Sequence, residues 1–177
     1  GEIAQCDFWF PDIEVPVGFG QTRTATALPV LTMICGYCRW LQAMLIPTRR
    51  AEDLFAGWWG HLQALGAVPR VLVWDGEGAI GRWRGGRSEL TADCQAFRGT
   101  LATKVIICRP ADPEAKGLIE RAHDYLERAF LPGRSFASPR SSTLSSPTGS
   151  PWSTPGSAAR WGAPRPTGSP PTGPPCS

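Results

Sequence analysis

Residues 70–76, with the sequence RVLVWDG, decide the fold that this chain is expected to adopt. Their run of apolar residues ends at Asp75-Gly76, which is the pattern of a short strand buried on both faces. Residues 104–108 (KVIIC) form a second run of this kind, closed by Pro110. Strands buried on both faces need helices on either side of the sheet, so these two runs indicate an α/β protein.

Three further strands are expected before this stretch. Residues 3–10 form a strand-like run that ends at Pro11. Residues 27–35 and 39–46 are two apolar runs on either side of Gly36-Tyr37, which is typical of neighbouring strands joined by a tight turn.

Residues 49–65 are expected to form a helix between these strands and the deciding stretch. We expect Thr48 to cap this helix, and Gly66 and Pro69 to end it. Its apolar stripe at helical spacing consists of Leu54, Phe55, Trp58, Leu62 and Leu65.

The polar residues 76–92 are expected to form a loop with a short helix, and residues 113–131 a final helix. The apolar face of the final helix consists of Leu118, Ala122, Tyr125, Leu126 and Ala129, and its opposite side of Lys116, Glu120, His123 and Glu127. The predicted order is β-β-β-α-β-α-β-α, a mixed central sheet with helices packed on it.

Composition divides the chain into two parts. From Arg140 onward it is almost entirely Ser, Pro, Gly, Thr and Ala, with Leu144 as its one branched aliphatic residue, and no acidic residue follows Glu127. Such a segment cannot bury enough apolar surface to offset the entropy of ordering it. We therefore expect a folded domain over residues 1–137 and a disordered low-complexity tail over residues 138–177.

Charge and hydropathy narrow the class of protein. The formal net charge of +3 fits a nucleic-acid partner but does not require one. The sequence contains neither an apolar run of the roughly 20 residues that span a bilayer nor a signal-peptide pattern, so a soluble cytoplasmic protein is expected. Because the chain opens at Gly1 without Met and enters strand-like sequence at once, we expect upstream residues to be missing.

The cysteines are scattered and mostly lie inside apolar runs, which favours buried reduced thiols over disulfides. Cys35 and Cys38 have the spacing of half a zinc site. No second pair follows, and only His61 and His123 could complete four ligands, so two core cysteines beside a turn are the preferred interpretation.

Three carboxylates occupy chemically suggestive positions. Asp7 lies among apolar residues of the first strand, Asp75 at the carboxyl end of a buried strand, and Glu120 on the polar side of the last helix. Neighbouring carboxylates repel each other unless a cation lies between them, and oxygen ligands favour Mg²⁺ or Mn²⁺. The alternatives are a solvent-facing strand aspartate, an Asp-Gly turn and an ordinary charge on a wetted helix face. Periodicity alone does not bring the three together.

Four blocks of sequence, in order, resemble the integrase catalytic core of the IstA-type transposases of bacterial insertion sequences. They are QCDFWFP around Asp7, GYCRWLQAMLIPTRRAEDLFAGW from Gly36, GAVPRVLVWDGEGAIGR from Gly66, and RPADPEAKGLIERAHDYLERAFLPGRSF from Arg109. The resemblance covers nearly all of residues 1–136. It implies a ribonuclease H-like fold.

By this resemblance, Asp7, Asp75 and Glu120 match the family's catalytic and metal-ligating Asp, Asp and Glu, which hold two Mg²⁺ or Mn²⁺ ions. The activity it implies is DNA transposition: phosphodiester cleavage that releases a 3′-hydroxyl, followed by transfer of that end to target DNA. The partners it implies are transposon-end and target DNA, an AAA+ helper ATPase and further copies of the chain. The rival hypotheses are an inactive remnant that only binds DNA or assists assembly, and a nuclease that cuts without joining.

The chain departs from the family pattern at three positions: Gly76 replaces Asn, Cys38 replaces Ser, and His123 replaces an Asn one turn after the Glu. We expect His123 to be a surface residue that is not essential for joining; the alternative is a contact with the metal shell or with DNA. Glu77 is a weaker candidate near the metal site.

Basic residues near the carboxylates are candidates for DNA contact, because Lys and Arg neutralise backbone phosphates. An aromatic residue beside them, Trp83, could stack on bases or be tucked into the core. The candidate DNA-binding residues are Arg82, Arg84, Arg87, Lys116 and Arg121.

The tail raises a separate hypothesis. After about Ser138 the composition changes abruptly where the family continues with an amphipathic helix, so we interpret the tail as translated from a shifted frame. A genuine disordered linker is the alternative.

Overall fold

The computed structural model describes residues 2–18, 21–24, 29–109, 113–132 and 144–145. The expected tail over residues 138–177 therefore lies outside the described residues, apart from the two residues of one short strand. No helix in the described part of the chain has the length and apolar character needed to span a bilayer.

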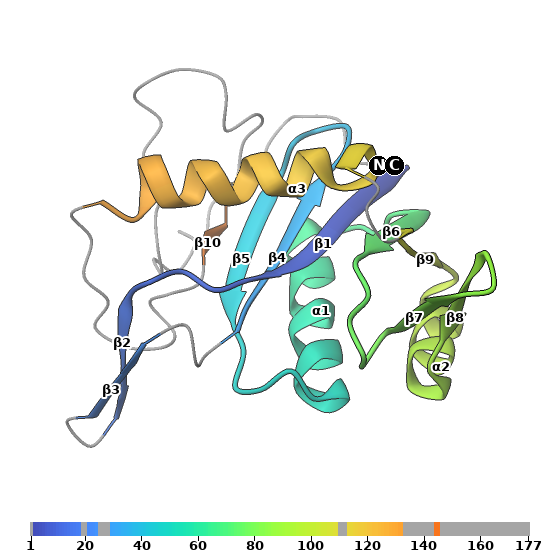
Figure 1. Ribbon diagram of the computed structural model, residues 1–177, viewed down its shortest axis with the longest axis horizontal. Helices are drawn as coiled ribbons and strands as arrows, with labels where there is room; N and C mark the ends of the chain where they lie inside the picture. The colour runs from blue at the N-terminus through green and yellow to red at the C-terminus, as the bar shows by residue number, and fades with distance from the viewer. Residues whose placement is uncertain (1, 19–20, 25–28, 110–112, 133–143, 146–177) are drawn as a thin grey trace.

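A mixed sheet forms the centre of the protein (Figure 1). Its strands lie in the order β10-β5-β4-β1-β6-β9. Strand β1 pairs antiparallel with β4 and parallel with β6, β5 pairs antiparallel with β4, and β9 continues the parallel side next to β6. The strands are β1 (Ile3–Trp9), β4 (Val30–Cys35), β5 (Leu41–Leu45), β6 (Val71–Trp74), β9 (Lys104–Ile107) and β10 (Leu144–Ser145).

Helices cover both faces of this sheet, as the sequence predicts (Figure 1). Residues of α1 (Ala51–Leu65) and α2 (Ala92–Leu101) pack in one hydrophobic cluster, and α3 (Pro113–Tyr125) packs in another on the opposite face. The alternation of side chains along β4 shows this division, because Leu31 and Met33 belong to the α1 cluster whereas Val30 and Ile34 belong to the α3 cluster. The predicted order β-β-β-α-β-α-β-α is confirmed.

Helix α1 lies unusually close to the sheet. A Cβ atom at Gly57 would lie 2.8 Å from a methyl carbon of Ile46 and 3.0 Å from one of Leu31, so only glycine fits without rearrangement. The helix ends at Gly66, whose φ of 73° closes it in the left-handed conformation that glycine adopts readily. The predicted stripe and the predicted C-terminal end of this helix are both confirmed.

The predicted cap of α1 is wrong. The helix begins after Arg50, which makes no side-chain capping hydrogen bond. Thr48 precedes this position by two residues, and its hydroxyl accepts a hydrogen bond from the Arg50 N–H and donates one to Asp53. Thr48 therefore fixes the turn that leads into the helix.

Residues 76–92 differ from the predicted loop with a short helix. They contain a hairpin of β7 (Gly81–Arg84) and β8 (Arg87–Leu90), and α2 begins only at Ala92. The two turn residues, Gly85 and Gly86, have φ angles of 55° and 79°. Paired glycines at positive φ are a strong hairpin signal, which the prediction overlooked. A second hairpin of β2 (Glu14–Gly18) and β3 (Gln21–Thr24) was also not predicted.

The apolar face of the last helix is partly mispredicted. After α3 the chain makes one wider turn over Leu126–Phe130, with the Leu131 N–H donating to the Leu126 carbonyl over five residues at 2.9 Å. The wider turn shifts the phase of the face, so Phe130 is buried and Ala129 is exposed. Strand β6 also departs slightly from its prediction, since Leu72 and Trp74 are buried but Val71 and Val73 are half-buried.

The cysteine interpretation holds for the described residues. Cys6, Cys35, Cys94 and Cys108 are buried, and Cys38 is half-buried. Burial raises the pKa of the Cys94 thiol to about 11, as expected for an inert core thiol. Cys176 lies outside the described residues.

His61 is a buried polar residue between α1 and the sheet. Its Nδ1 lies 2.9 Å from Gln42 Oε1 and its Nε2 lies 3.1 Å from the Leu31 carbonyl oxygen. Burial lowers its pKa to about 4, although the bond to Leu31 acts in the opposite direction. The folded protein therefore keeps this imidazole neutral.

We predict that His61 makes the protein acid-sensitive. Because its pKa falls from 6.5 to about 4 on folding, the unfolded chain binds the proton first, and stability is lost as pH falls from about 6.5 towards 4. At pH 5 the loss should be about 2 kcal/mol. Urea unfolding at pH 7 and pH 5 should therefore show a smaller pH effect in His61→Gln than in the original protein. Parallel pH dependences in the two proteins would contradict this assignment.

Candidate active site

The pairing of β1 with β6 brings two of the predicted carboxylates together. The two strands run parallel, with Ile3 beside Val71 and Gln5 beside Val73. One further two-residue step places Asp7 beside Asp75, on the face of the sheet that α3 covers. Asp7 lies inside its strand, whereas Asp75 directly follows the end of β6.

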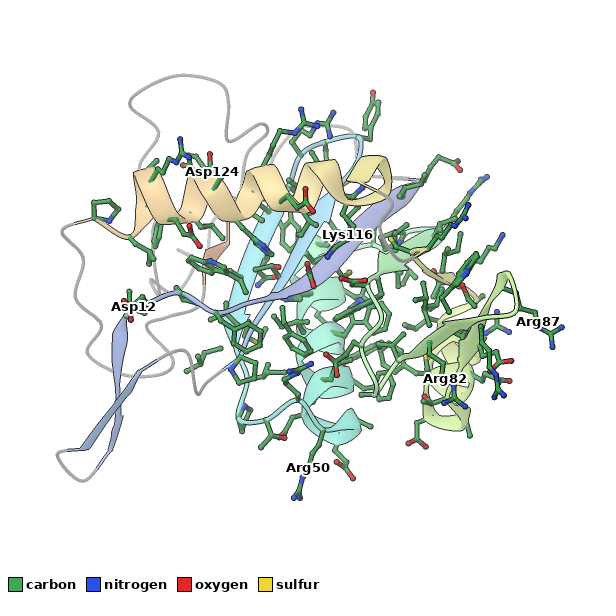
Figure 2. All side chains as sticks on the ribbon, in the orientation of Figure 1. Asp12, Arg50, Arg82, Arg87, Lys116 and Asp124 are labelled. Atoms are coloured by element: carbon green, nitrogen blue, oxygen red, sulfur yellow. The ribbon has the colours of Figure 1, made fainter. Side chains whose placement is uncertain are left out.

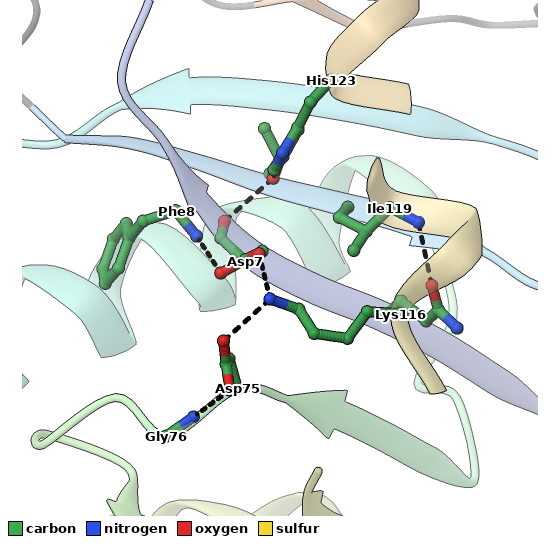
Figure 3. A network of polar contacts seen from close by, with 9 residues as sticks. Asp7, Phe8, Asp75, Gly76, Lys116, Ile119 and His123 are labelled. Carbon is green, nitrogen blue, oxygen red and sulfur yellow. Dashed lines mark hydrogen bonds and ion pairs between the residues drawn. The ribbon is translucent and has the colours of Figure 1, made fainter. Parts of the chain in front are cut away.

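Lys116 of α3 bridges the two aspartates (Figure 3). Its Nζ lies 2.8 Å from Oδ2 of Asp7 and 2.8 Å from Oδ2 of Asp75. The side chains of Lys116 and Asp7 are 18% and 20% exposed, and that of Asp75 is 53% exposed. The two carboxylates thus share one cationic group at a partly sheltered position.

The ionisation of the bridge follows from its geometry. The hydrogen bond from Lys116 lowers the pKa of Asp75, and the Gly76 N–H, which donates to Oδ1 at 2.7 Å, acts in the same direction. Burial lowers the pKa of Lys116, but hydrogen bonds and charges from both aspartates outweigh it and raise this pKa overall. Asp75 and Lys116 are therefore both charged near neutral pH.

Glu120 is not part of this contact. It is exposed, one helical turn after Lys116 on α3. Within the described part of the chain, no three His, Cys, Asp or Glu side chains are grouped closely enough to hold a metal ion. The structure thus joins Asp7 to Asp75, and the third residue at the centre is Lys116, which the sequence had suggested only as a DNA contact.

Asp7 is held firmly by its neighbours. Its Oδ1 accepts the Phe8 N–H at 2.9 Å, and its backbone carbonyl accepts the Thr32 hydroxyl at 2.9 Å. On the same face, Gln5 Oε1 accepts the Ile119 N–H at 2.9 Å, which ties α3 to β1 beside the bridge.

The expected surface position of His123 is wrong. Its ring stacks on Trp9, with 6.1 Å between the ring centroids, and its Nε2 lies 2.8 Å from the Thr32 hydroxyl oxygen. The Thr32 hydroxyl donates its one hydrogen bond to the Asp7 carbonyl, so its oxygen is the acceptor in the contact with His123. Nε2 of His123 is therefore the donor and carries the ring hydrogen. Burial lowers the pKa of His123 to about 4, so the ring is neutral near pH 7. That joining does not require His123 stays a prediction.

The remaining basic candidates lie on a separate part of the surface. Arg82, Arg84 and Arg87 are exposed on the β7–β8 hairpin, where Figure 2 shows Arg82 and Arg87 pointing outward, away from Lys116. Trp83 packs against the α1 core, which favours the core alternative over base stacking. Arg121 is exposed on α3, and its Nε donates to the Gly117 carbonyl at 2.8 Å.

An open groove adjoins the hairpin, at the β9 edge of the sheet. Its walls come from β8, α2 and β9, and they include three basic side chains and one acidic one. These residues are Arg87, Arg98, Lys104 and Glu89. Sequence analysis missed Arg98 and Lys104, because they adjoin the hairpin only in the folded chain.

Comparison with known proteins agrees with this architecture. A transposase for an IS21-like insertion sequence element of Bacteroides fragilis is 30% identical over 138 residues, which are 76% of this chain and 25% of that protein. The chain thus spans about a quarter of that relative's length. No protein-family model matches the chain.

The chain is also similar to two solved structures. A chain of the simian T-cell lymphotropic virus intasome in complex with PP2A regulatory subunit B56 gamma has a TM-score of 0.52 and 15% identity, covering 71% of this chain and 38% of that one. The catalytic core domain of BIV integrase has a TM-score of 0.49 and 14% identity, covering 71% of this chain and 66% of that one.

The mixed sheet and its helical layers form a ribonuclease H-like fold. The sequence is similar to that of a transposase of an IS21-like insertion sequence, which confirms the resemblance to IstA-type transposases seen in the sequence.

We predict that Lys116 stabilises the metal-free protein by offsetting the charge repulsion between the two aspartates. Lys116→Met should lower the free energy of unfolding by about 1 to 2 kcal/mol, less than a fully buried pair would lose because Asp75 is half exposed. Urea unfolding without divalent metal measures this loss. Adding Asp7→Asn to Lys116→Met should restore part of it, because the repulsion between carboxylates disappears.

Arg128 offers a matched control on the same helical segment. It pairs with Asp124 at 2.7 Å, but its side chain is 80% exposed. Arg128→Met should cost less than about 0.5 kcal/mol. An equal loss in Lys116→Met and Arg128→Met would contradict a special role for the bridge.

Proposed function

We propose that this chain is the catalytic core of a DNA transposase that cleaves phosphodiester bonds and transfers 3′ ends to target DNA with Mg²⁺ or Mn²⁺. The observation that carries the proposal is the convergence of Asp7 and Asp75 on one cationic group from α3. These residues are far apart in the sequence, and it is the parallel pairing of β1 with β6 that makes them neighbours.

The residues present fit a divalent metal. Asp7 and Asp75 offer hard carboxylate oxygens, which Mg²⁺ and Mn²⁺ prefer, and the Lys116 ammonium already shows that a cation is stable between them. Glu120, one turn along α3, would supply the third carboxylate, and Lys116 would yield its position to the ion. When two such ions are bound, the chemistry they supply is activation of the attacking oxygen and stabilisation of the leaving oxygen.

The chain's own residues would orient this site. Phe8 and Thr32 fix Asp7, so one ligand is preorganised, and α3 presents Glu120 from the side of the sheet that carries both aspartates. No side-chain nucleophile is needed. In the first step the oxygen of water bonds to phosphorus as the 3′-oxygen leaves and takes up a proton. In the second step that 3′-hydroxyl loses its proton, bonds to a target phosphorus and displaces the target's 3′-oxygen.

DNA would approach from the basic surface around the β7–β8 hairpin. Arg82, Arg84 and Arg87 are exposed there, and Arg98 and Lys104 extend the positive charge along the adjoining groove. Arg121 would add a contact near Glu120, and Lys116 one more once it is released from the aspartates. The AAA+ helper ATPase and assembly of several copies are part of this proposal through the similarity to IstA-type transposases.

The rival functions differ in their products. A structure-specific nuclease would cut labelled transposon-end DNA without joining it, and an inactive remnant would only bind it. A strand-transfer assay with labelled DNA, in the presence of Mg²⁺ or Mn²⁺, separates all three. The transposase proposal requires joined products.

We predict that Asp75→Asn abolishes the stabilisation of this protein by divalent metal. The variant keeps the size of the side chain but removes one of the charges that hold the ion. The measurement is the melting temperature with and without Mg²⁺ or Mn²⁺, and Glu120→Gln should also reduce the shift. Asp124→Asn is the control, because Asp124 pairs with Arg128 away from the bridge. An unchanged shift in Asp75→Asn would overturn the metal assignment.

We also predict that the hairpin contacts DNA phosphates. Arg87→Glu should weaken binding to duplex DNA for all sequences alike, and it should reduce the slope of log K against log salt by about 1. Fluorescence anisotropy at several salt concentrations gives both quantities. Arg128→Glu changes the charge equally on a different element, so equal effects of the two variants would rule out a specific hairpin contact.

A further inference from the structure

We propose that Arg49 is a positioning residue that fixes the distance between Asp7 and Asp75. The inference rests on the proposed function, because it takes these aspartates as metal ligands. Arg49 lies in the connection between β5 and α1, outside the bridge itself, and contacts a near neighbour of each aspartate.

The first contact holds the loop that follows Asp75. Arg49 forms an ion pair with Glu77 at 2.5 Å between Nη2 and Oε2, and its Nε lies 3.2 Å from the same oxygen. The Glu77 side chain is only 12% exposed, so the ion pair is sheltered on its acidic side. Glu77 is two residues after Asp75, and its N–H donates to the Asp75 carbonyl at 2.7 Å.

The far end of this loop is held by Thr91, whose hydroxyl donates to the Ala79 carbonyl at 2.8 Å, so Arg49 acts on the part nearer to Asp75. Gly76 and Gly78 flank Glu77, and a Cβ at either position would meet nothing within 4 Å. Trp74 anchors the loop on one side and the buried Ile80 on the other. The Glu77 carbonyl accepts the N–H groups of Ile80 and Gly81, both at 2.9 Å, so a fixed Glu77 transmits its position to the rest of the loop.

The second contact lies on the Asp7 side. The Arg49 guanidinium lies 5.5 Å from the centre of the Phe8 ring and 5.8 Å from that of Phe10, within the range of cation–π attraction. Phe8 follows Asp7 directly, and its N–H donates to Asp7 Oδ1. One guanidinium therefore ties the strand that carries Asp7 to the loop that carries Asp75.

The platform for Arg49 is rigid. Helix α1 packs so closely on the sheet that a Cβ atom at Gly57 would collide with Ile46 and Leu31, and Thr48 fixes the turn before the helix through Arg50 and Asp53. A charged group on such a platform can oppose the repulsion that would otherwise separate two neighbouring carboxylates and their loop. Lysine would keep the charge but not the flat, multiply bonded contact.

The test uses Arg49→Ala, Arg49→Lys and Glu77→Gln, with Arg50→Ala as the matched control. Arg50 is the adjacent arginine, but it is exposed, lies at the start of α1 and points into solvent (Figure 2). The first readout is amide hydrogen exchange of Ile80 and Gly81 in metal-free protein. The second is the affinity for Mn²⁺, from the metal dependence of the melting temperature.

We expect Arg49→Ala and Glu77→Gln to speed exchange at Ile80 and Gly81 by about tenfold, and to weaken Mn²⁺ binding by about 10- to 100-fold. Arg49→Lys should lie between Arg49→Ala and the original protein, and combining Arg49→Ala with Glu77→Gln should add little, because both changes break the same contact. Arg50→Ala should leave both readouts unchanged. Should Arg49→Ala prove too unstable to purify, Arg49→Lys and Glu77→Gln decide the matter.

The outcomes separate the two proposals. Equal behaviour of the Arg49 and Arg50 variants in both readouts would overturn the role of Arg49. Faster exchange with unchanged Mn²⁺ affinity would reduce Arg49 to a structural role and also overturn it. If the original protein does not bind Mn²⁺ at all, the proposed function fails, and the positioning role fails with it, whereas faster exchange at Ile80 and Gly81 in Arg49→Ala than in Arg50→Ala would still show that Arg49 holds the loop.

Discussion

The parallel pairing of β1 with β6 is the constraint on which the site depends. Side chains alternate along a strand, so a register shift of one residue would move Asp7 to the α1 face, into the apolar layer that contains Cys6 and Phe8. That register is enforced by burial, because Ala4, Leu72 and Trp74 must face the same core. The apolar packing under α1 therefore determines where the charges lie under α3.

The two faces of the sheet therefore differ in the kind of side chain that they bury. The α1 face is filled with large apolar side chains, including Trp58 and Trp74, which pack edge to face with 5.2 Å between their ring centroids. On the α3 face a row of polar groups from Gln5, Asp7 and Thr32 passes between the strands and the helix. Polar groups in that position are costly unless paired, and each of these has a partner on the neighbouring strand or on α3.

Much of the fold could be predicted from the sequence, because the spacing of apolar residues indicates most of the strands and helices. Apart from β10, which falls in the expected tail, the strands of the main sheet and the helices that cover it follow from runs and stripes that are visible in the chain. The errors occur where a rule other than periodicity operates. The hairpin at Gly85-Gly86 is recognised by turn geometry and not by apolar spacing. The contact of Thr48 with Asp53 depends on the three-dimensional path of the chain, and the burial of Phe130 depends on a wide helical turn that no apolar pattern signals.

The site was predictable only in part. The sequence marked Asp7, Asp75 and Glu120 through their positions and a family resemblance, and the register then joined the first two. Lys116 at the centre of the bridge was not foreseen, because a lysine on the polar side of a helix looks the same whether it meets solvent or two carboxylates. His123 was misjudged for the same reason: its partners Trp9 and Thr32 lie on strands far away in the sequence.

The unequal surroundings of the two aspartates would suit the exchange of the Lys116 ammonium group for the proposed metal ion. Asp7 is inside a strand, is 20% exposed and is held by hydrogen bonds at both its side chain and its carbonyl. Asp75 is 53% exposed and begins a loop flanked by glycines. A fixed carboxylate defines where the cation lies, and a more adjustable one can follow a change from an ammonium group to a metal ion, whose preferred oxygen distances differ. Such a loop still needs a limit to its movement, and the Arg49–Glu77 ion pair, one residue beyond Gly76, is placed to set that limit.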